Sequence, residues 1–117
     1  MDVSRIESWH AHVYFDAGTR DTAWALREEI TARFADEMVM GRFHERPVGP
    51  HPRWSYQVAF KPDKFERIVP WLNLNRRGLT VLVHPNTGED LEDHRDRAAW
   101  LGESVALDLA ALAPLTA

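Results

Sequence analysis

The sequence predicts a single α+β domain over residues 1–117, and two kinds of hydrophobic periodicity lead to that prediction. Apolar and polar residues alternate in residues 9–15, 54–60 and 79–84, which is the pattern of a β-strand whose two faces have different environments. Apolar residues recur at helical spacing in residues 24–34 and 65–74. At 117 residues the chain has room for one hydrophobic core and is too short to need two.

The first predicted strand has one apolar face and one polar face. Its apolar residues alternate with two histidines and a tyrosine: Trp9, Ala11, Val13 and Phe15 on one side, His10, His12 and Tyr14 on the other. A helix is expected next, capped by Thr19 or Asp21 and ending near residue 35. Its apolar stripe is predicted to consist of Trp24, Leu26, Ile30 and Phe34.

The middle of the chain predicts two more strands and a second helix. Residues 38–43 are apolar enough for a short strand, whereas residues 45–52 contain three prolines and a glycine and predict an irregular connection. Residues 54–60 form the third predicted strand. The helix that follows carries Pro70, which we expect to kink it or to end its regular part, and Gly78 is expected to stop it.

The order of these elements predicts a ferredoxin-like βαββαβ fold. Residues 79–84 form the last predicted strand, 85–88 a turn, 90–101 a partly helical cover, and 104–112 a C-terminal helical extension. In this arrangement the four strands form one antiparallel sheet with both helices on one face. Strands 9–15 and 54–60 lie in its middle, and strand 79–84 lies beside strand 9–15.

Composition excludes several classes of function. The formal net charge is -4 and there is no block of Lys and Arg, so no nucleic-acid partner is expected. The chain has no cysteine, so any metal must be held by nitrogen or oxygen. No apolar run approaches the roughly 18 residues that a membrane span needs, and the first residues lack an apolar signal segment. These observations predict a cytoplasmic protein that does not bind membranes.

Three histidines are predicted to meet on the polar face of the sheet. His10 and His12 are two residues apart on one strand, which places their Cα atoms roughly 6.5 to 7 Å apart on the same side. The antiparallel strand 79–84 ends beside the start of strand 9–15, so His84 arrives next to them. Neutral imidazole is the commonest metal ligand in proteins. The three side chains therefore predict a site for zinc, iron, manganese, nickel or copper, or for a substrate.

Two further histidines and several carboxylates are candidates for the same site. His94 lies on the predicted cover and is a candidate acid or base. His51 reaches the site only if the proline-rich connection folds back or a second subunit supplies it. A carboxylate is a further candidate ligand, because two histidines and one carboxylate form a known ferrous iron site. Four carboxylates come into question: Glu7, Glu89, Asp90 and Asp93. His44 has no evident partner.

Three stretches of the sequence resemble the fungal-type DOPA 4,5-dioxygenase family, small aromatic ring-opening dioxygenases with bacterial members. The stretches are residues 9–16 (WHAHVYFD), residues 49–60 with the segments GPHP and YQVAF, and residues 84–102 with HPNTGEDLEDH and WLG. Together they extend over most of the chain, and every histidine of the three stretches is in place.

The resemblance implies a function for the histidines. It implies a homodimeric, ferredoxin-like enzyme that uses non-haem Fe(II) and molecular oxygen to open a catechol ring next to its two hydroxyls. Zinc, nickel or manganese is an alternative occupant in a purified sample. His10, His12 and His84 are then the expected metal ligands, and His51 and His94, which fall inside the family's motifs, the expected catalytic residues. The substrate is a DOPA-like or caffeate-like catechol.

Two other functions are compatible with the sequence. Ferredoxin-like dimers use the open face of the sheet to bind small molecules without catalysis, because fold alone does not define function. A metal-dependent isomerase or hydrolase acting on an aromatic or keto acid is the second alternative. Stoichiometric metal separates the enzymes from the binding module, and oxygen consumption separates the dioxygenase from the other enzymes.

Overall fold

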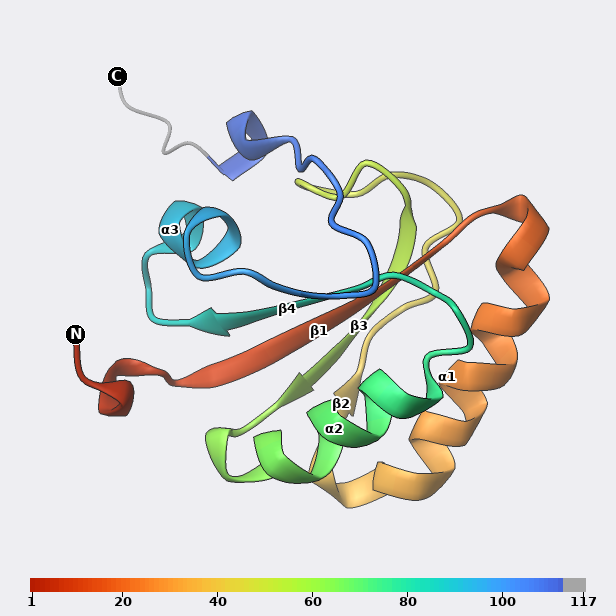
Figure 1. Ribbon diagram of the computed structural model, residues 1–117, viewed down its shortest axis with the longest axis horizontal. Helices are drawn as coiled ribbons and strands as arrows, with labels where there is room; N and C mark the ends of the chain where they lie inside the picture. The colour runs from red at the N-terminus through yellow and green to blue at the C-terminus, as the bar shows by residue number, and fades with distance from the viewer. Residues whose placement is uncertain (113–117) are drawn as a thin grey trace.

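The computed structural model describes residues 1–112, and they form one sheet with two helices on one of its faces (Figure 1). The sheet is antiparallel and has the strand order β2-β3-β1-β4-β5. Its strands are β1 (Ser8–Phe15), β2 (Val39–Met40), β3 (Trp54–Phe60), β4 (Val81–Asn86) and β5 (Ala99–Leu101). The predicted α+β ferredoxin-like order is confirmed, with β1 and β3 in the interior and β4 beside β1.

Helices α1 (Arg20–Phe34) and α2 (Phe65–Asn75) cover the face of the sheet that carries the apolar residues of β1 (Figure 1). The core between them contains Ala11, Val13 and Phe15 from β1, Val81 and Val83 from β4, and Leu26, Ile30, Ile68 and Leu72 from the helices. All of these side chains are at most 5% exposed. Burial of this apolar surface is the main contribution to stability, because apolar area removed from water contributes about 25 cal/mol per Å².

Both helices differ in detail from the sequence prediction. In α1 the buried stripe is Ala23, Leu26, Ile30 and Phe34, while Trp24 is 40% exposed and packs edge-on against Phe43. The turn before α1 is closed by a capping box between Asp16 and Thr19. In α2, Pro70 lies inside the helix and does not end it. Pro70 is exposed, so the backbone carbonyl that loses its partner there can be solvated by water.

The sheet has one more strand than predicted. Residues 90–101 were expected to be a partly helical cover, but only α3 (Asp90–Arg95) is helical, and β5 pairs with β4 through Leu82 and Trp100. Residues 99–101 lie between charged segments, and a strand of three residues is too short to show an alternating pattern in the sequence. The C-terminal helix expected at 104–112 is also wrong in extent, because only Leu109–Leu112 form a 3-10 turn.

Two other strands have shifted boundaries. The strand predicted at 38–43 is only two residues long as β2, since the backbone leaves the ladder at Gly41, where the N–H still bonds the carbonyl of Gln57. Strand β4 starts two residues later than predicted and runs through Pro85. Proline is tolerated there because β5 pairs with β4 only as far as Val83, so no neighbouring strand needs a donor from Pro85.

A buried carboxylate fixes the connection between β4 and α3 on the other face of the sheet. Asp93 is 0% exposed and accepts hydrogen bonds from the Thr87 backbone N–H at 2.8 Å, from the Thr87 hydroxyl at 2.9 Å and from the Arg97 guanidinium at 3.0 Å. Buried charges are tolerated when they are paired and hydrogen-bonded in this way. Asp93 therefore sets the position of α3 relative to β4.

Replacing Asp93 by Ala should lower the free energy of unfolding by about 2 to 3 kcal/mol, because it leaves buried donors of Thr87 and Arg97 without an acceptor. Urea unfolding measures the effect. Asp96→Ala is the matched control, since Asp96 is exposed and its ion-pair partner among residues 1–112 is Arg95 at the surface. That variant should change stability by no more than about 0.5 kcal/mol. Equal losses in both variants would contradict a structural role for Asp93.

Candidate metal centre

The second face of the sheet places the three predicted histidines next to one another. His10 pairs directly with His84 across β1 and β4, and His12 follows two residues later on the same face of β1. One imidazole nitrogen from each of the three residues lies within 4.8 Å of the others. The convergence predicted from strand order and alternation is therefore present, and we refer to His10, His12 and His84 as the histidine triad.

The triad is largely shielded from water. His84 is 0% exposed and His12 is 5% exposed, while His10 is half-buried at the edge of the cluster. The two Nε2 atoms of His12 and His84 are 3.0 Å apart. Two imidazole nitrogens that approach so closely either share a proton or direct their lone pairs at one cation.

A hydrogen bond determines which nitrogen of His84 is free. His84 Nδ1 lies 2.9 Å from the carbonyl oxygen of Pro85, and a carbonyl only accepts, so Nδ1 carries the proton and donates it. The remaining nitrogen of a neutral imidazole, Nε2, is then unprotonated and faces His12. Metal-binding histidines typically have this arrangement, with one nitrogen on the metal and the other donating to a carbonyl or carboxylate.

The triad is neutral at physiological pH, as metal binding requires. Burial lowers the pKa of His84 to about 3 from its ordinary value of 6.5, although the bond to the Pro85 carbonyl opposes the shift. Burial, followed by the neighbouring histidines, holds the pKa of His12 well below its ordinary value. The pKa of His10 is also lowered, mainly by burial and then by His94, with Asp90 acting against the shift. Few protons must therefore leave when an ion binds.

The residues fit a divalent metal through nitrogen alone. The group of ligand atoms that gather within 4.8 Å in residues 1–112 consists of the three imidazoles and includes no carboxylate. Two of the four candidate carboxylates are engaged elsewhere: Asp93 with Thr87 and Arg97, and Glu89 with Arg97 at 3.0 Å. A site of three imidazoles suits zinc, iron, manganese, nickel or copper. These donor atoms alone do not select one of the five metals.

His51 and His94 lie next to the triad in the same chain. The proline-rich connection folds back through a bridge between Val48 and His51, helped by the positive φ of 58° at Gly49. The ring of His51, which is 8% exposed, has its centroid 4.1 Å from that of His12. His94 extends from α3 and its ring centroid lies 3.9 Å from that of His84. No second subunit is needed to bring His51 to the site.

Three residues that the sequence analysis left without a role also belong to this region. The hydroxyl of Tyr14 lies 2.6 Å from His51 Nδ1 and is buried. His44 forms a bridge with Ser55 on β3 and, with Gln57, lines a cavity of about 180 Å³ beside His12 and His51. The alternation of β1 already placed Tyr14 on the polar face, but nothing in the sequence indicated that a loop residue such as His44 pairs with β3.

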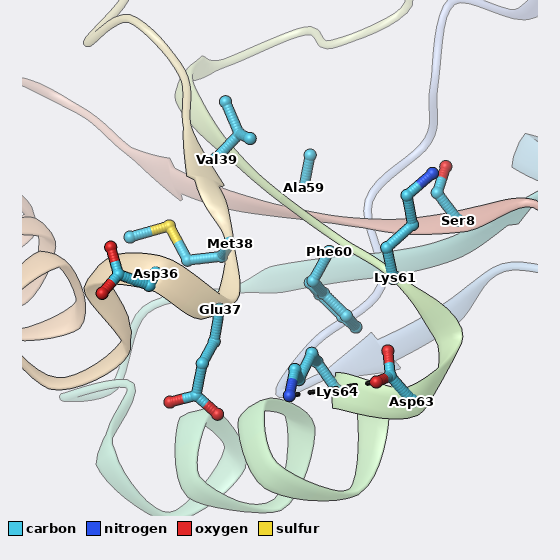
Figure 2. A pocket seen from close by; sticks show the side chains of 10 residues that line it. All are labelled: Ser8, Asp36, Glu37, Met38, Val39, Ala59, Phe60, Lys61, Asp63 and Lys64. Carbon is cyan, nitrogen blue, oxygen red and sulfur yellow. Dashed lines mark ion pairs between the residues drawn. The ribbon is translucent and has the colours of Figure 1, made fainter.

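A larger groove lies elsewhere and has a different character. It has a volume of about 520 Å³ and is lined by residues around β2, the end of β3 and the start of α2 (Figure 2). Met38 and Phe60 form part of its apolar floor, and its charged groups are partly paired, as in the contact of 3.9 Å between Asp63 and Lys64. It contains no histidine, so size alone does not identify the site of chemistry.

None of the helices in residues 1–112 is long and apolar enough to cross a membrane.

The fold and the triad together define a small α+β protein with an all-imidazole site suited to a divalent metal. Comparison with known proteins gives the family. The Dopa 4,5-dioxygenase family matches residues 9–111, and the chain belongs to this family.

Individual relatives agree with this assignment. The chain is 37% identical over 116 residues to a DOPA 4,5-dioxygenase of Amanita muscaria, a match that includes 93% of this chain and 51% of that protein. It is 40% identical over 112 residues to an uncharacterized 21.2 kDa protein of Botryotinia fuckeliana, with coverages of 87% and 61%. The chain thus spans about half to three fifths of the length of these curated relatives.

A solved structure shares the whole fold. The crystal structure of a protein from Nostoc punctiforme, described as a "putative dioxygenase", superposes with a TM-score of 0.92 at 50% identity, over 96% of both chains. The five-stranded sheet and its two covering helices are therefore common to both chains.

The metal-free protein should lose stability as the pH falls below about 6.5, because the unfolded chain then binds protons that the folded triad excludes. The folded pKa values of His84 and His51 are lowered to about 3 and about 4, so their contribution is complete above 6.5 and declines toward pH 4. Thermal melts of chelator-treated protein from pH 7.5 to 5 measure the decline. His84→Gln should make the pH dependence shallower, and a melting temperature that stays constant over this range would contradict the prediction.

Replacing His12 or His84 by Ala should weaken zinc binding by at least about 100-fold, because a ligand is lost outright and even the loss of a hydrogen-bond partner of a ligand costs about 10- to 100-fold. Competitive titration against a chromophoric chelator gives the affinities, and circular dichroism checks the fold. His44→Ala is the matched control, because this imidazole lies in the same region but outside the triad. Retention of wild-type affinity in His12→Ala would rule out the triad as the metal site.

Proposed function

We propose that this protein is a non-haem, metal-dependent extradiol dioxygenase that opens the ring of a catechol with molecular oxygen. The observation that carries the proposal is the neutral histidine triad beside a cavity of ring size, in a member of the Dopa 4,5-dioxygenase family. The Amanita muscaria relative bears the name of that activity. Fe(II) is the proposed native metal, and the homodimer and the cytoplasmic location remain predictions from the sequence.

The cavity beside His12 has the size of one aromatic ring. Its volume of about 180 Å³ is close to that of an engineered protein cavity of about 150 Å³ that binds benzene. Val48 and Pro50 contribute apolar wall, and His51, Ser55 and Gln57 contribute hydrogen-bonding groups. An aromatic ring with two adjacent hydroxyls matches that combination of flat apolar surface and polar contacts.

Two groups of histidines have different roles in the proposed reaction. His10, His12 and His84 would hold the metal, which supplies Lewis acidity toward the catechol oxygens and the capacity to activate dioxygen. Burial of His12 and His84 excludes water and so strengthens electrostatic interactions inside the site. His51 and His94 lie beside the triad, where an imidazole can accept or donate a hydrogen bond to a substrate hydroxyl.

The protein reconstituted with Fe(II) under anaerobic conditions should consume one equivalent of oxygen per catechol and form a yellow ring-opened product when DOPA or caffeate is added in air. An oxygen electrode and absorbance spectra measure both. His12→Ala and His84→Ala should abolish the reaction, whereas Asp96→Ala, which changes an exposed side chain paired with Arg95, should retain it.

Each other outcome has a defined meaning. Metal bound at the triad without oxygen uptake by any catechol would contradict dioxygenase activity and favour an isomerase or hydrolase. Absence of stoichiometric metal in the intact protein would favour the small-molecule binding module. Full activity of the His12→Ala variant would place the reaction at another site.

A further inference from the structure

A hydrogen bond to the backbone determines which nitrogen of His94 carries the ring proton. Its Nδ1 atom lies 2.7 Å from the backbone carbonyl oxygen of Asp90, one turn earlier in α3. Because a carbonyl oxygen only accepts hydrogen bonds, Nδ1 of His94 must carry the proton. A neutral imidazole has a single ring proton, so Nε2 of His94 has a free lone pair.

His51 has the opposite arrangement because its partner is Tyr14. The Tyr14 oxygen and His51 Nδ1 are 2.6 Å apart, and the two residues are 1% and 8% exposed. A hydroxyl can donate or accept, but His51 is the hydrogen-bond partner found for the Tyr14 hydroxyl among residues 1–112. If His51 donated, the Tyr14 hydrogen would be buried without an acceptor in this part of the chain. Tyr14 therefore donates, and His51 carries its own proton on Nε2.

Both rings are close enough to act on one small molecule. Their centroids are 6.4 Å apart, and each adjoins a different member of the triad: His51 adjoins His12, and His94 adjoins His84. In each ring Nε2 lies on the opposite side from the nitrogen that is fixed by a protein partner. The two rings that adjoin the triad thus differ: His51 has an N–H donor at Nε2, and neutral His94 has a bare nitrogen acceptor at Nε2.

We propose that Tyr14 is a positioning residue that holds His51 as an N–H donor for an anionic substrate oxygen, while the Asp90 carbonyl holds His94 as the proton acceptor. This inference rests on the proposed function and assigns separate roles to the two histidines. The substrate class is a phenol that binds as its anion. The O–H bond of the phenol breaks, the proton forms a bond with His94 Nε2, and the electron pair stays on the oxygen, which accepts the N–H of His51.

The division of roles has a physical basis. Two neutral imidazoles with the same tautomer would offer two donors or two acceptors, and neither pair both removes a proton and stabilises the negative charge that remains. A fixed N–H directed at a developing oxygen anion is an effective electrostatic contribution in a site that excludes water. Neutral histidine serves in this way elsewhere in enzymology. Among residues 1–112 the hydroxyl of Tyr14 has His51 as its hydrogen-bond partner, so the effect of that hydroxyl on the reaction is exerted through the His51 ring.

The tautomers can be observed directly by nitrogen-15 NMR of protein labelled at histidine, in the metal-free form and with zinc, which is diamagnetic. Ring nitrogens with and without a proton have well separated shifts, and His51→Gln and His94→Gln variants assign the signals. We expect His51 to be protonated at Nε2 and His94 at Nδ1. Tyr14→Phe should abolish the preference of His51 for the Nε2 proton without changing His94.

Tyr56→Phe is the matched control. Tyr56 is also a buried tyrosine on a neighbouring strand, but its hydroxyl packs in the core on the helix side and has no hydrogen-bond partner among residues 1–112. Removing that hydroxyl should leave the histidine signals and the kinetics unchanged. The Tyr14→Phe variant should instead lower kcat for ring opening by about 10-fold or more, with KM and metal content near those of the wild type.

Two results would overturn the proposal. One is a wild-type His51 that carries its proton on Nδ1. The other is a Tyr14→Phe variant whose His51 tautomer and kcat match those of the wild type. If the intact protein opens no catechol but His51 and His94 show the expected tautomers that depend on Tyr14, the proposed function fails while the assignment of donor and acceptor stands. The NMR result therefore decides this inference separately from catalysis.

Discussion

The antiparallel pairing of β1 with β4 is the constraint on which the candidate site depends. It sets His10 directly opposite His84 and places His12 two residues further along the same face. A shift of the register by one residue would turn His84 toward the helices and bring Val83 to the site, because side chains alternate between the faces of a strand. The same register buries Val81 and Val83 in the core. The same register of β1 against β4 thus forms both the hydrophobic core and the triad.

Much of this arrangement could be predicted from the sequence because it follows from alternation and strand order. The alternation of residues 9–15 separates the apolar face from His10 and His12, and the order of elements places His84 beside them. Strand β5 could not be predicted, since three residues between charged segments carry too little periodicity. The C-terminal helix was wrong for the opposite reason: residues 104–108 have apolar residues at suitable spacing, but they form no helix.

The surroundings of the triad were less accessible to sequence reasoning. Whether His51 reaches the site depends on how a loop with three prolines folds, and the hydrogen bond of Tyr14 to His51 becomes visible only once that loop is placed. From the sequence, Asp93 is one of four carboxylates that could complete the metal ligand set. In the structure it is a buried anchor for Thr87 and Arg97, which shows that local hydrogen-bond donors decide the role of a carboxylate. The cavity lined by His44 likewise depends on how the loop is placed.

The proposed chemistry requires that the three imidazoles bind one metal ion. Anomalous X-ray diffraction from crystals of the metal-loaded protein, recorded on both sides of the absorption edge of the metal, tests it most directly. We expect a single strong anomalous peak within bonding distance of nitrogens of His10, His12 and His84. A peak coordinated by surface carboxylates, with none between the three imidazoles at full metal loading, would contradict it.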